Sequence, residues 1–173
     1  MGMEIFLRIE GAAGGSKNSM HKDWSEISSW QWGLARTRKA GNNGIQESLQ
    51  MNRITIVKPV AVDSPLLMNL LATRKVMDTV EISVAAATER RVVQKRTIGV
   101  TLKQVLIQSI DTGAVVGEEE FYETVVLAFG QVKYEFFQHT SAVIGGAAAS
   151  SRSETFEWGG AKEAPKTDEV PVS

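Results

Sequence analysis

The chain contains no cysteine and only two histidines. The absence of cysteine excludes a disulfide framework and every thiolate-ligated zinc or redox site, and it leaves the redox compartment undetermined. His21 and His139 lie in separate polar segments, at no spacing suited to metal coordination or to a catalytic triad. We therefore expect both histidines to be surface or structural side chains.

Neither sign of charge is in excess, because 19 lysines and arginines face 20 aspartates and glutamates. This balance gives no electrostatic reason to expect binding to nucleic acid or to an anionic membrane. Residues 1–10 include three charged side chains and lack the basic start and apolar block of a signal peptide, and no apolar run is long enough for a transmembrane helix. We expect neither nucleic-acid binding nor membrane insertion.

The motifs of common catalytic and binding sites are also missing. The glycine clusters lack the spacing of a phosphate-binding loop followed by Lys and Ser or Thr. Glu118, Glu119 and Glu120 favour a solvated loop tip over a pair of catalytic carboxylates or a cation site. The four tryptophans lack an accompanying basic groove, which favours packing in a core or interface over stacking on bases or sugars. We expect no catalytic, cofactor-binding or metal-binding residues, no cofactor and no enzymatic activity.

The chain does contain two long apolar runs, 97–110 and 123–137, joined by the loop 111–122. Both are rich in β-branched and aromatic residues, which predicts two adjacent antiparallel strands. A strand of fourteen residues would span roughly 46 Å at about 3.3 Å per residue, so these strands should coil or bend. Because both faces are apolar, both need cover. They form either the buried central hairpin of a monomeric sandwich or a surface that a partner chain covers.

Alternating apolar and polar residues predict further strands at 3–10, 26–33, 51–57 and 79–85, and a short last strand at 155–158. In the second of these strands, Trp30 and Trp32 share one face. Gln31 lies on the opposite face, which should therefore meet something polar.

One helix is predicted, and it should begin with Ser64 as its cap and Pro65 at its first position. It should run to about Thr73 or Arg74, with an apolar face formed by Leu66, Leu67, Leu70 and Leu71. By contrast, the segment 36–50 is polar, contains glycine and has no apolar period, which predicts a long projecting loop.

Together these elements predict an all-β fold with one α-helix, a β-barrel-like domain of two packed antiparallel sheets with about seven strands. We expect residues 1–160 to form a single domain. Residues 161–173, with Pro165 and Pro171, should form a disordered C-terminal tail.

The segment 21–33, HKDWSEISSWQWG, resembles the early signature of the Hcp family, the tube proteins of bacterial type VI secretion systems. Three more stretches agree in order and spacing, and the resemblance covers about residues 1–134: these are 3–11, 54–60 leading to Ser64-Pro-Leu-Leu, and 101–110 followed by 123–129. The chain also departs from the family pattern. Ala61 replaces the usual acidic residue three positions before Ser64, and the glycine usual after the helix is missing from 73–76.

The resemblance implies a non-enzymatic structural protein that forms hexameric rings with a wide pore. The rings would stack into a tube that carries small effector proteins. The implied partners are the other subunits of the homo-hexamer, the spike protein, the sheath and the baseplate. The implied location is the bacterial cytoplasm during assembly, followed by secretion through the apparatus without a signal peptide.

The resemblance also suggests roles for particular residues. Gln31 is a candidate for the wet pore wall. The basic residues Arg36, Arg38 and Lys39 are candidates for contacting Glu118, Glu119 and Glu120 of the next ring, an expectation drawn from charge alone. Two other hypotheses remain open at this point: a monomeric β-barrel or sandwich that binds a small ligand in a tryptophan-lined pocket, and a hydrolase, for which no set of catalytic residues is recognisable.

Overall fold

The structure is a computed structural model that describes residues 2–86, 96–139 and 151–159. These residues form eleven strands and one helix, more strands than the roughly seven expected. The elements in chain order are β1 (Met3–Ile9), β2 (Ser25–Ile27), β3 (Ser29–Gln31), β4 (Leu34–Gly41), β5 (Gly44–Met51), β6 (Ile54–Pro59), α1 (Ser64–Ala72), β7 (Met77–Ala86), β8 (Arg96–Thr112), β9 (Tyr122–Ala128), β10 (Gln131–His139) and β11 (Ser151–Trp158).

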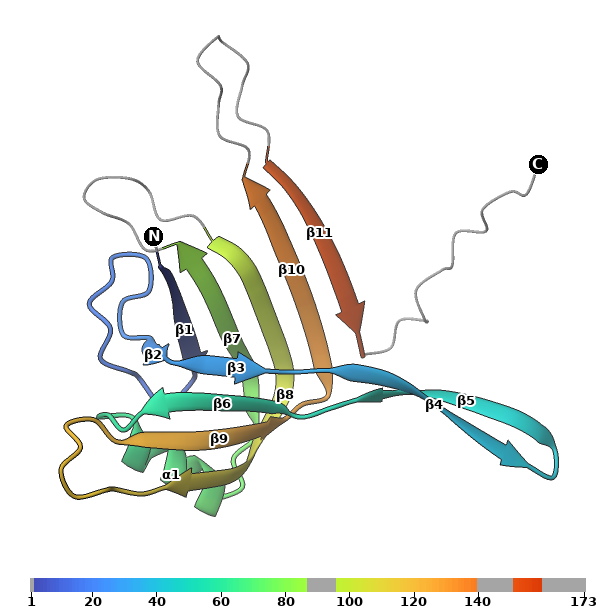
Figure 1. Cartoon of the computed structure of the whole chain (residues 1–173), viewed down its shortest axis with the longest axis horizontal. Coiled ribbons are helices and arrows are strands. Elements are labelled where there is room, and N and C mark those ends of the chain that lie inside the picture. The colour runs from blue at the N-terminus through green and yellow to red at the C-terminus, as the bar shows by residue number, and fades with distance from the viewer. Residues whose placement is uncertain (1, 87–95, 140–150, 160–173) are drawn as a thin grey trace, which may run out of the picture.

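Nine strands form one antiparallel sheet, and β4 and β5 form a separate two-stranded sheet. The main path runs β2-β1-β7-β8-β9-β6-β3, with β10 and β11 attached beside β8. The first part of β8 pairs with β7 and β10, and its last part pairs with β9. The two layers in Figure 1 are therefore one sheet that bends along β8. The predicted fold class is confirmed: the two packed layers are parts of one bent sheet, and β4 and β5 add a small second sheet.

The predicted pair of long strands is present, and it bends. The run 123–137 is divided into β9 and β10, and both pair with β8. At the bend, Gln104 has a φ of 54°, and the Gly130 amide donates to the carbonyls of Lys103 and Gln104 at 3.0 and 3.2 Å. A Cβ on Gly130 would lie 2.6 Å from Oε1 and 3.3 Å from Cβ of Gln104, so a larger residue here would require the Gln104 side chain to shift. The bend lets one pair of strands contribute to both layers.

Several predicted strand boundaries differ from those in the structure. The strand predicted at 26–33 is two short strands, because β2 pairs with β1 while β3 pairs with β6. Ser28 lies between them, and its amide already donates to the Val57 carbonyl. The strand predicted at 51–57 begins at Ile54, and the last strand begins earlier than expected, at Ser151. The predicted tail, 161–173, lies outside the described residues, and the prediction of a single domain over 1–160 stays a prediction.

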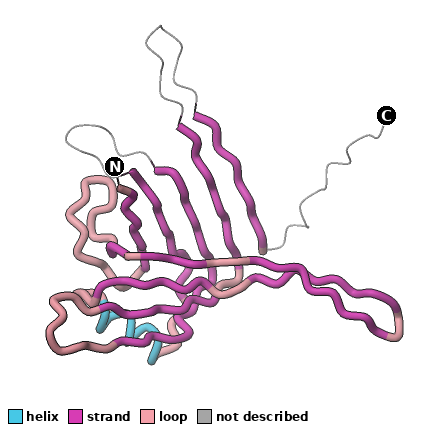
Figure 2. Tube along the Cα trace, viewed as in Figure 1, coloured by secondary structure: helices cyan, strands magenta, loops and turns pink. Residues whose placement is uncertain are grey.

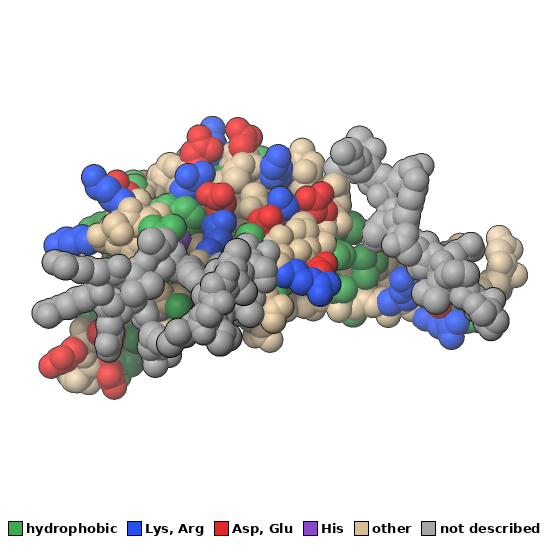
Figure 3. Space-filling view, turned by 90° about the horizontal axis from the view of Figure 1, so that it is seen from above, with side chains coloured by type: hydrophobic (Ala, Val, Ile, Leu, Met, Phe, Trp, Pro, Cys, Tyr) green, Lys and Arg blue, Asp and Glu red, His purple; other side chains and the backbone are tan. Residues whose placement is uncertain are grey.

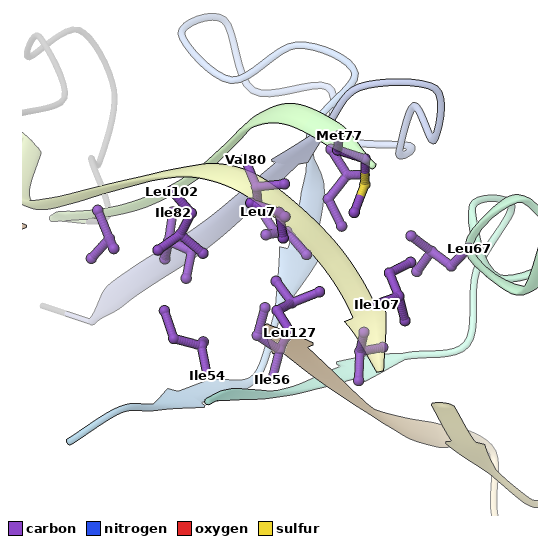
Figure 4. Close-up of a cluster of buried hydrophobic side chains, with 14 of the residues drawn as sticks. Leu7, Ile54, Ile56, Leu67, Met77, Val80, Ile82, Leu102, Ile107 and Leu127 are labelled. Atoms are coloured by element: carbon purple, nitrogen blue, oxygen red, sulfur yellow. The ribbon is translucent and has the colours of Figure 1, made fainter. Parts of the chain in front are cut away.

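The core lies between the two layers of the bent sheet. Figure 4 shows the inward side chains of β1, β6, β7, β8 and β9 meeting there, with Leu67 of α1 pointing toward them. Leu67 is fully buried and Leu70 and Leu71 are partly buried, but Leu66 is 40% exposed. The predicted apolar face of the helix was therefore wrong at Leu66, whose side chain contributes to the surface.

The start of α1 differs from the prediction by one residue. Asp63 is the N-cap, Ser64 is the first helical residue and Pro65 the second. The Asp63 side chain makes no capping hydrogen bond, because its carboxylate is held by the Lys58 ammonium at 2.9 Å inside the protein. The Ser64 hydroxyl accepts the Ala61 amide at 2.9 Å. The Ser-Pro signal located the helix correctly, although Ser64 serves another purpose.

The end of α1 has a conformation in which glycine is the usual residue. The Arg74 amide donates to the Leu71 carbonyl and the Lys75 amide to the Leu70 carbonyl, at 3.1 and 3.0 Å. These two bonds form a Schellman motif, whose left-handed residue is usually glycine. Here Arg74 occupies that position with a φ of 52°. A non-glycine residue in this conformation costs roughly 1–2 kcal/mol.

We expect Arg74→Gly to raise the free energy of unfolding by about 0.5–1 kcal/mol, since relief of backbone strain exceeds the added freedom of glycine in the unfolded chain. Urea denaturation at fixed protein concentration measures the change. Lys75→Gly is the matched control, because this neighbouring residue does not have a positive φ, and it should give no gain. Equal or lower stability of Arg74→Gly would contradict the assignment of strain.

The loop predicted at 36–50 is a β-hairpin. β4 and β5 pair along their whole length, and the closing pair Gly41 and Gly44 leaves the two-residue turn Asn42-Asn43. The hairpin projects far from the body of the molecule, as Figures 1 and 2 show, so the prediction of a projecting segment is confirmed. The strands were missed because nearly all their residues are exposed, which removes the apolar alternation that marks a half-buried strand.

Candidate functional site

His21 lies next to a potential nucleophile, but the pair is inaccessible. The His21 ring stacks on Phe6 with centroids 4.2 Å apart, and its Nε2 lies 2.8 Å from the Ser83 hydroxyl. Ser83 also accepts the Arg96 Nε–H at 3.0 Å, and its side chain is fully buried on β7. No substrate can reach this hydroxyl, so His21 is structural and joins its loop to β7. His139 ends β10, and its side chain lies outside the described part.

The tryptophans do not line a common pocket. Trp24 borders a groove of about 830 Å³ next to β1 and α1, where the Arg8 guanidinium lies 5.6 Å from the centre of its ring. Trp158 borders a separate hollow of about 160 Å³ on β10 and β11. Trp30 and Trp32 both pack against Tyr134, with ring centroids 6.4 Å apart. Most of the aromatic surface is therefore used in packing.

Charged side chains on the face seen in Figure 3 are interspersed, and acidic and basic groups alternate over the main sheet. Arg8 and Glu81 form an ion pair at 2.9 Å, and Lys133 lies 3.0 Å from Glu135 and 3.9 Å from Glu157. The hydrogen bond and charge of Glu135 raise the pKa of Lys133. Within the described ranges, no cluster of His, Asp and Glu could hold a metal ion. The same ranges contain no helix long and apolar enough to cross a membrane.

Gln31 is exposed at the end of β3, where it is the register partner of Thr55 on β6. Trp30 and Trp32, on either side of it, are partly buried against the core. The predicted alternation of the three side chains is therefore confirmed. Whether Gln31 faces a pore stays a prediction.

The three basic residues predicted for ring stacking lie on two opposite faces of the hairpin. Arg36 and Arg38 have the same parity on β4, and Lys39 has the other. Across the hairpin, Glu47 binds both arginines at 3.1 Å, Arg36 through Nη1 and Arg38 through Nε. The basic residues therefore do not form one patch. The two arginines form a partly neutralised cluster with Glu47, and Lys39 projects from the other face.

In the part of the chain that the structure describes, the two strands of the hairpin belong to no larger sheet. β4 and β5 pair only with each other, and among their residues only Thr37 and Met51 are half-buried, while the others are exposed. An isolated two-stranded hairpin is marginally stable in water at best. A projecting hairpin of this length is therefore suited to contact with another chain.

The acidic residues Glu118, Glu119 and Glu120 lie in the exposed loop 113–121 between β8 and β9. Glu120 accepts a hydrogen bond from the Tyr122 hydroxyl, and this bond and its negative charge raise the pKa of Tyr122. In Figure 1 this loop and the hairpin lie at opposite ends of the long axis of the molecule. The basic and acidic candidates therefore cannot meet within one chain.

A buried charge network was missed in the sequence. The Lys58 ammonium lies 2.9 Å from Asp63 and 2.9 Å from Glu123, and all three side chains are at most 1% exposed. Ser64 donates to the same Glu123 oxygen, Oε1, at 2.8 Å, and Ser25 donates to Asp63. The other carboxylate oxygen, Glu123 Oε2, has no hydrogen-bond partner in the described structure.

This network joins β2, β6, β9 and the first turn of α1, so it fixes the helix to the sheet. The sequence contained one sign of this buried network, a lysine at an inward position of a strand. Lys58 has the same parity as Ile54 and Ile56 on β6, and all three are buried. A lysine at an inward position requires a buried acidic partner. Asp63 supplies one carboxylate here, although the usual acidic residue of the family pattern is replaced by Ala61.

The comparisons with known proteins agree with this geometry. Residues 6–136 match the family model described as "Type VI secretion system effector, Hcp". The protein hcp1 of Pseudomonas aeruginosa is 26% identical over 138 residues, which make up 79% of this chain and 84% of that protein.

Solved structures show the same fold. A type six secretion system protein superposes with a TM-score of 0.70 at 18% identity, covering 80% of this chain and 86% of the other. Hcp1 from Salmonella typhimurium superposes with a TM-score of 0.65 at 21% identity, covering 91% and 95%. With the family match over most of its length, the chain belongs to the Hcp family, the structural, non-enzymatic proteins of the type VI secretion system.

Proposed function

We propose that the chain forms hexameric rings, and that these rings stack into the inner tube of a type VI secretion apparatus. The observation that carries the proposal is the projecting, exposed hairpin, whose strands pair only with each other, in a member of the Hcp family. A heterologous contact repeated around an axis closes a ring, and the same type of contact repeated along an axis forms a tube. Two distant surfaces on one chain, the hairpin and the acidic loop, suit such head-to-tail contacts.

The exposed ends of β10 and β11 support association in the same way. Phe136 and Trp158 are 44% and 38% exposed, although both belong to apolar side chains that continue the core face of the sheet. Tyr134 and Phe156 lie between them in the register and are half-buried, so this apolar face is partly open to solvent and suits contact with another chain. A neighbouring subunit in a ring would cover it. Gln31 is proposed to face the pore, where a polar side chain stays hydrated.

In this proposal the pore carries small effector proteins. The tube works with the spike protein, the sheath and the baseplate. The protein is assembled in the bacterial cytoplasm and leaves the cell through the apparatus, without a signal peptide.

The stacking contact joins the hairpin of one ring to the acidic loop of the next. Arg36, Arg38 and Glu47 together carry one net positive charge on one hairpin face, and Lys39 adds one on the other. The loop offers the three negative charges of Glu118, Glu119 and Glu120. Each ring would repeat this contact six times, so a weak surface attraction becomes significant when summed.

Reversing Arg38 and Lys39 to Glu is expected to raise the protein concentration needed for tube formation by at least about tenfold, because like charges would then meet six times per interface. Single rings should keep their mass, which sedimentation velocity measures while electron microscopy counts tubes. The matched control reverses Arg74 and Lys75, two adjacent exposed basic residues away from the hairpin. Unchanged tube formation in the hairpin variant would contradict the proposed contact.

A second candidate function is that of a monomeric module that binds a small ligand. The groove of about 830 Å³ beside Trp24 favours it, since Arg8, Lys22 and Trp24 offer charge and an aromatic face there. A stable monomer at high protein concentration would favour this candidate over the tube.

A further inference from the structure

The hairpin has one apolar face and one polar face. Register pairs on the first face bring together Leu34 with Met51, Arg36 with Leu49, Arg38 with Glu47 and Ala40 with Ile45. Register pairs on the second face are Ala35 with Gln50, Thr37 with Ser48 and Lys39 with Gln46. Side chains alternate between the two faces of a strand, so five apolar side chains share the face of Arg36 and Arg38.

This apolar face is open to solvent. Leu34, Ile45 and Leu49 are 47%, 62% and 38% exposed. Glu47 binds both arginines along the middle of the face, so the face carries only one net positive charge. An amphipathic sheet face with reduced charge fits a partner surface that is apolar with a surplus of negative charge.

The loop 113–121 has that composition. Val115 and Val116 are adjacent in this loop and are 66% and 104% exposed. Three glutamates follow directly after Gly117. At Phe136, another exposed apolar side chain, the register partner is Glu154, which pairs with Arg152 at 2.6 Å, so this position offers no surplus charge. Charge complementarity therefore favours the loop.

We propose that the apolar face of the hairpin docks onto Val115 and Val116 of a second copy of this chain, with Arg36 and Arg38 next to its Glu118, Glu119 and Glu120. The hairpin and the loop lie at opposite ends of the molecule, so the contact is between chains and runs head to tail. The proposal rests on the proposed function for placing the second copy in the next ring. It adds that apolar burial, and not charge alone, holds the rings together.

The absence of cysteine makes a direct test possible. The double variant Ile45→Cys with Val116→Cys places one thiol on the apolar face of the hairpin and one on the loop. The matched control is Gln46→Cys with Val116→Cys, because Gln46 is the next residue and has the opposite parity. The single variant Val116→Cys reports any pairing between loops. All three positions changed are exposed, and circular dichroism verifies the fold.

After mild oxidation, a denaturing gel without reductant should show a ladder of linked chains for the first pair and at least tenfold less linkage for the control. Equal linkage of both pairs, or no linkage of the first, would overturn the docking. Tubes seen in the same unlinked sample would leave the proposed function standing. A ladder that extends beyond six chains places the contact between rings. A ladder that stops at six supports the docking but counts against the stacking role in the proposed function.

Serine substitutions on the apolar face measure the contribution of apolar burial to tube formation. Ile45→Ser with Leu49→Ser should raise the concentration needed for tube formation at least tenfold, at low salt and at high salt alike. The matched variant Gln46→Ser with Gln50→Ser changes the opposite face and should leave tube formation within twofold. A double-serine variant that forms tubes as readily as the unchanged chain would overturn the apolar docking, even if the charge-reversal variant fails to stack.

Discussion

Replacing Lys58 by Met is expected to lower the free energy of unfolding by about 3–5 kcal/mol, because the change leaves two buried carboxylates without their shared cation. Lys58 is the register partner of Glu123 and lies 2.9 Å from both Glu123 and Asp63. All three side chains are buried, and an unpaired buried charge has a large desolvation cost. The side chain of Met is close to Lys in length, so packing changes little.

Urea denaturation followed by tryptophan fluorescence measures this effect, at one fixed protein concentration because association would shift the apparent stability. Lys133→Met is the matched control. Lys133 also contacts two carboxylates, Glu135 and Glu157, but it is 43% exposed, and its loss should change little. A Lys58→Met variant as stable as this control would contradict the structural role of the buried network.

A compensated variant separates charge from packing. Lys58→Met combined with Asp63→Asn and Glu123→Gln removes all three charges while it keeps similar side-chain shapes. We expect it to recover at least about half of the stability that Lys58→Met loses, since uncompensated charge is the larger part of the cost. No recovery would mean that the hydrogen bonds of the two carboxylates, from Ser25 and Ser64, matter more than their charge.

Trp32→Ala is expected to lower the free energy of unfolding by about 3 kcal/mol, in the range for large aromatic side chains replaced by Ala. The Trp32 ring lies 6.3 Å from Phe129 and 6.4 Å from both Tyr134 and Phe156. Its Nε1–H also donates to the Asn52 carbonyl at 3.1 Å. This one side chain therefore joins β10 and β11 to the start of the hairpin.

Thermal and urea unfolding measure the loss, and two further variants interpret it. Trp32→Phe keeps an aromatic ring but removes the hydrogen bond to Asn52, so it should lie between Trp32→Ala and the unchanged chain. Trp158→Ala removes a tryptophan that is 38% exposed and should have a smaller effect. Equal losses for Trp32→Ala and Trp158→Ala would show that the aromatic cluster is not what stabilises this region.

The fold class and most strands could be predicted from the sequence, because half-buried strands have a visible alternation. Ile54 and Ile56 on β6, and Val80, Ile82 and Val84 on β7, are inward side chains that alternate with outward ones. The hairpin β4 and β5 could not be recognised in this way, since neither of its faces contacts a core. Its turn offered the better signal, because Asn42-Asn43 between two glycines is typical of a two-residue hairpin turn.

Less of the candidate site could be predicted from the sequence. The exposed positions of Gln31 and the acidic loop were expected, and the structure places them at the surface. The division of Arg36, Arg38 and Lys39 between two faces depends on strand parity, and the sequence alone did not reveal a strand there. The Lys58 network depends on register between β6 and β9, which brings together residues 65 positions apart, a pairing that no local pattern specifies.

The mass of the protein in solution distinguishes a hexameric ring from a monomer. Light scattering on a size-exclusion column at near-physiological salt measures it without a shape assumption. A hexameric ring of chains of 18.9 kDa has a mass of about 113 kDa, and we expect this mass or a multiple of it. A monomer of 18.9 kDa that persists at high protein concentration would contradict ring formation and would favour a small binding module.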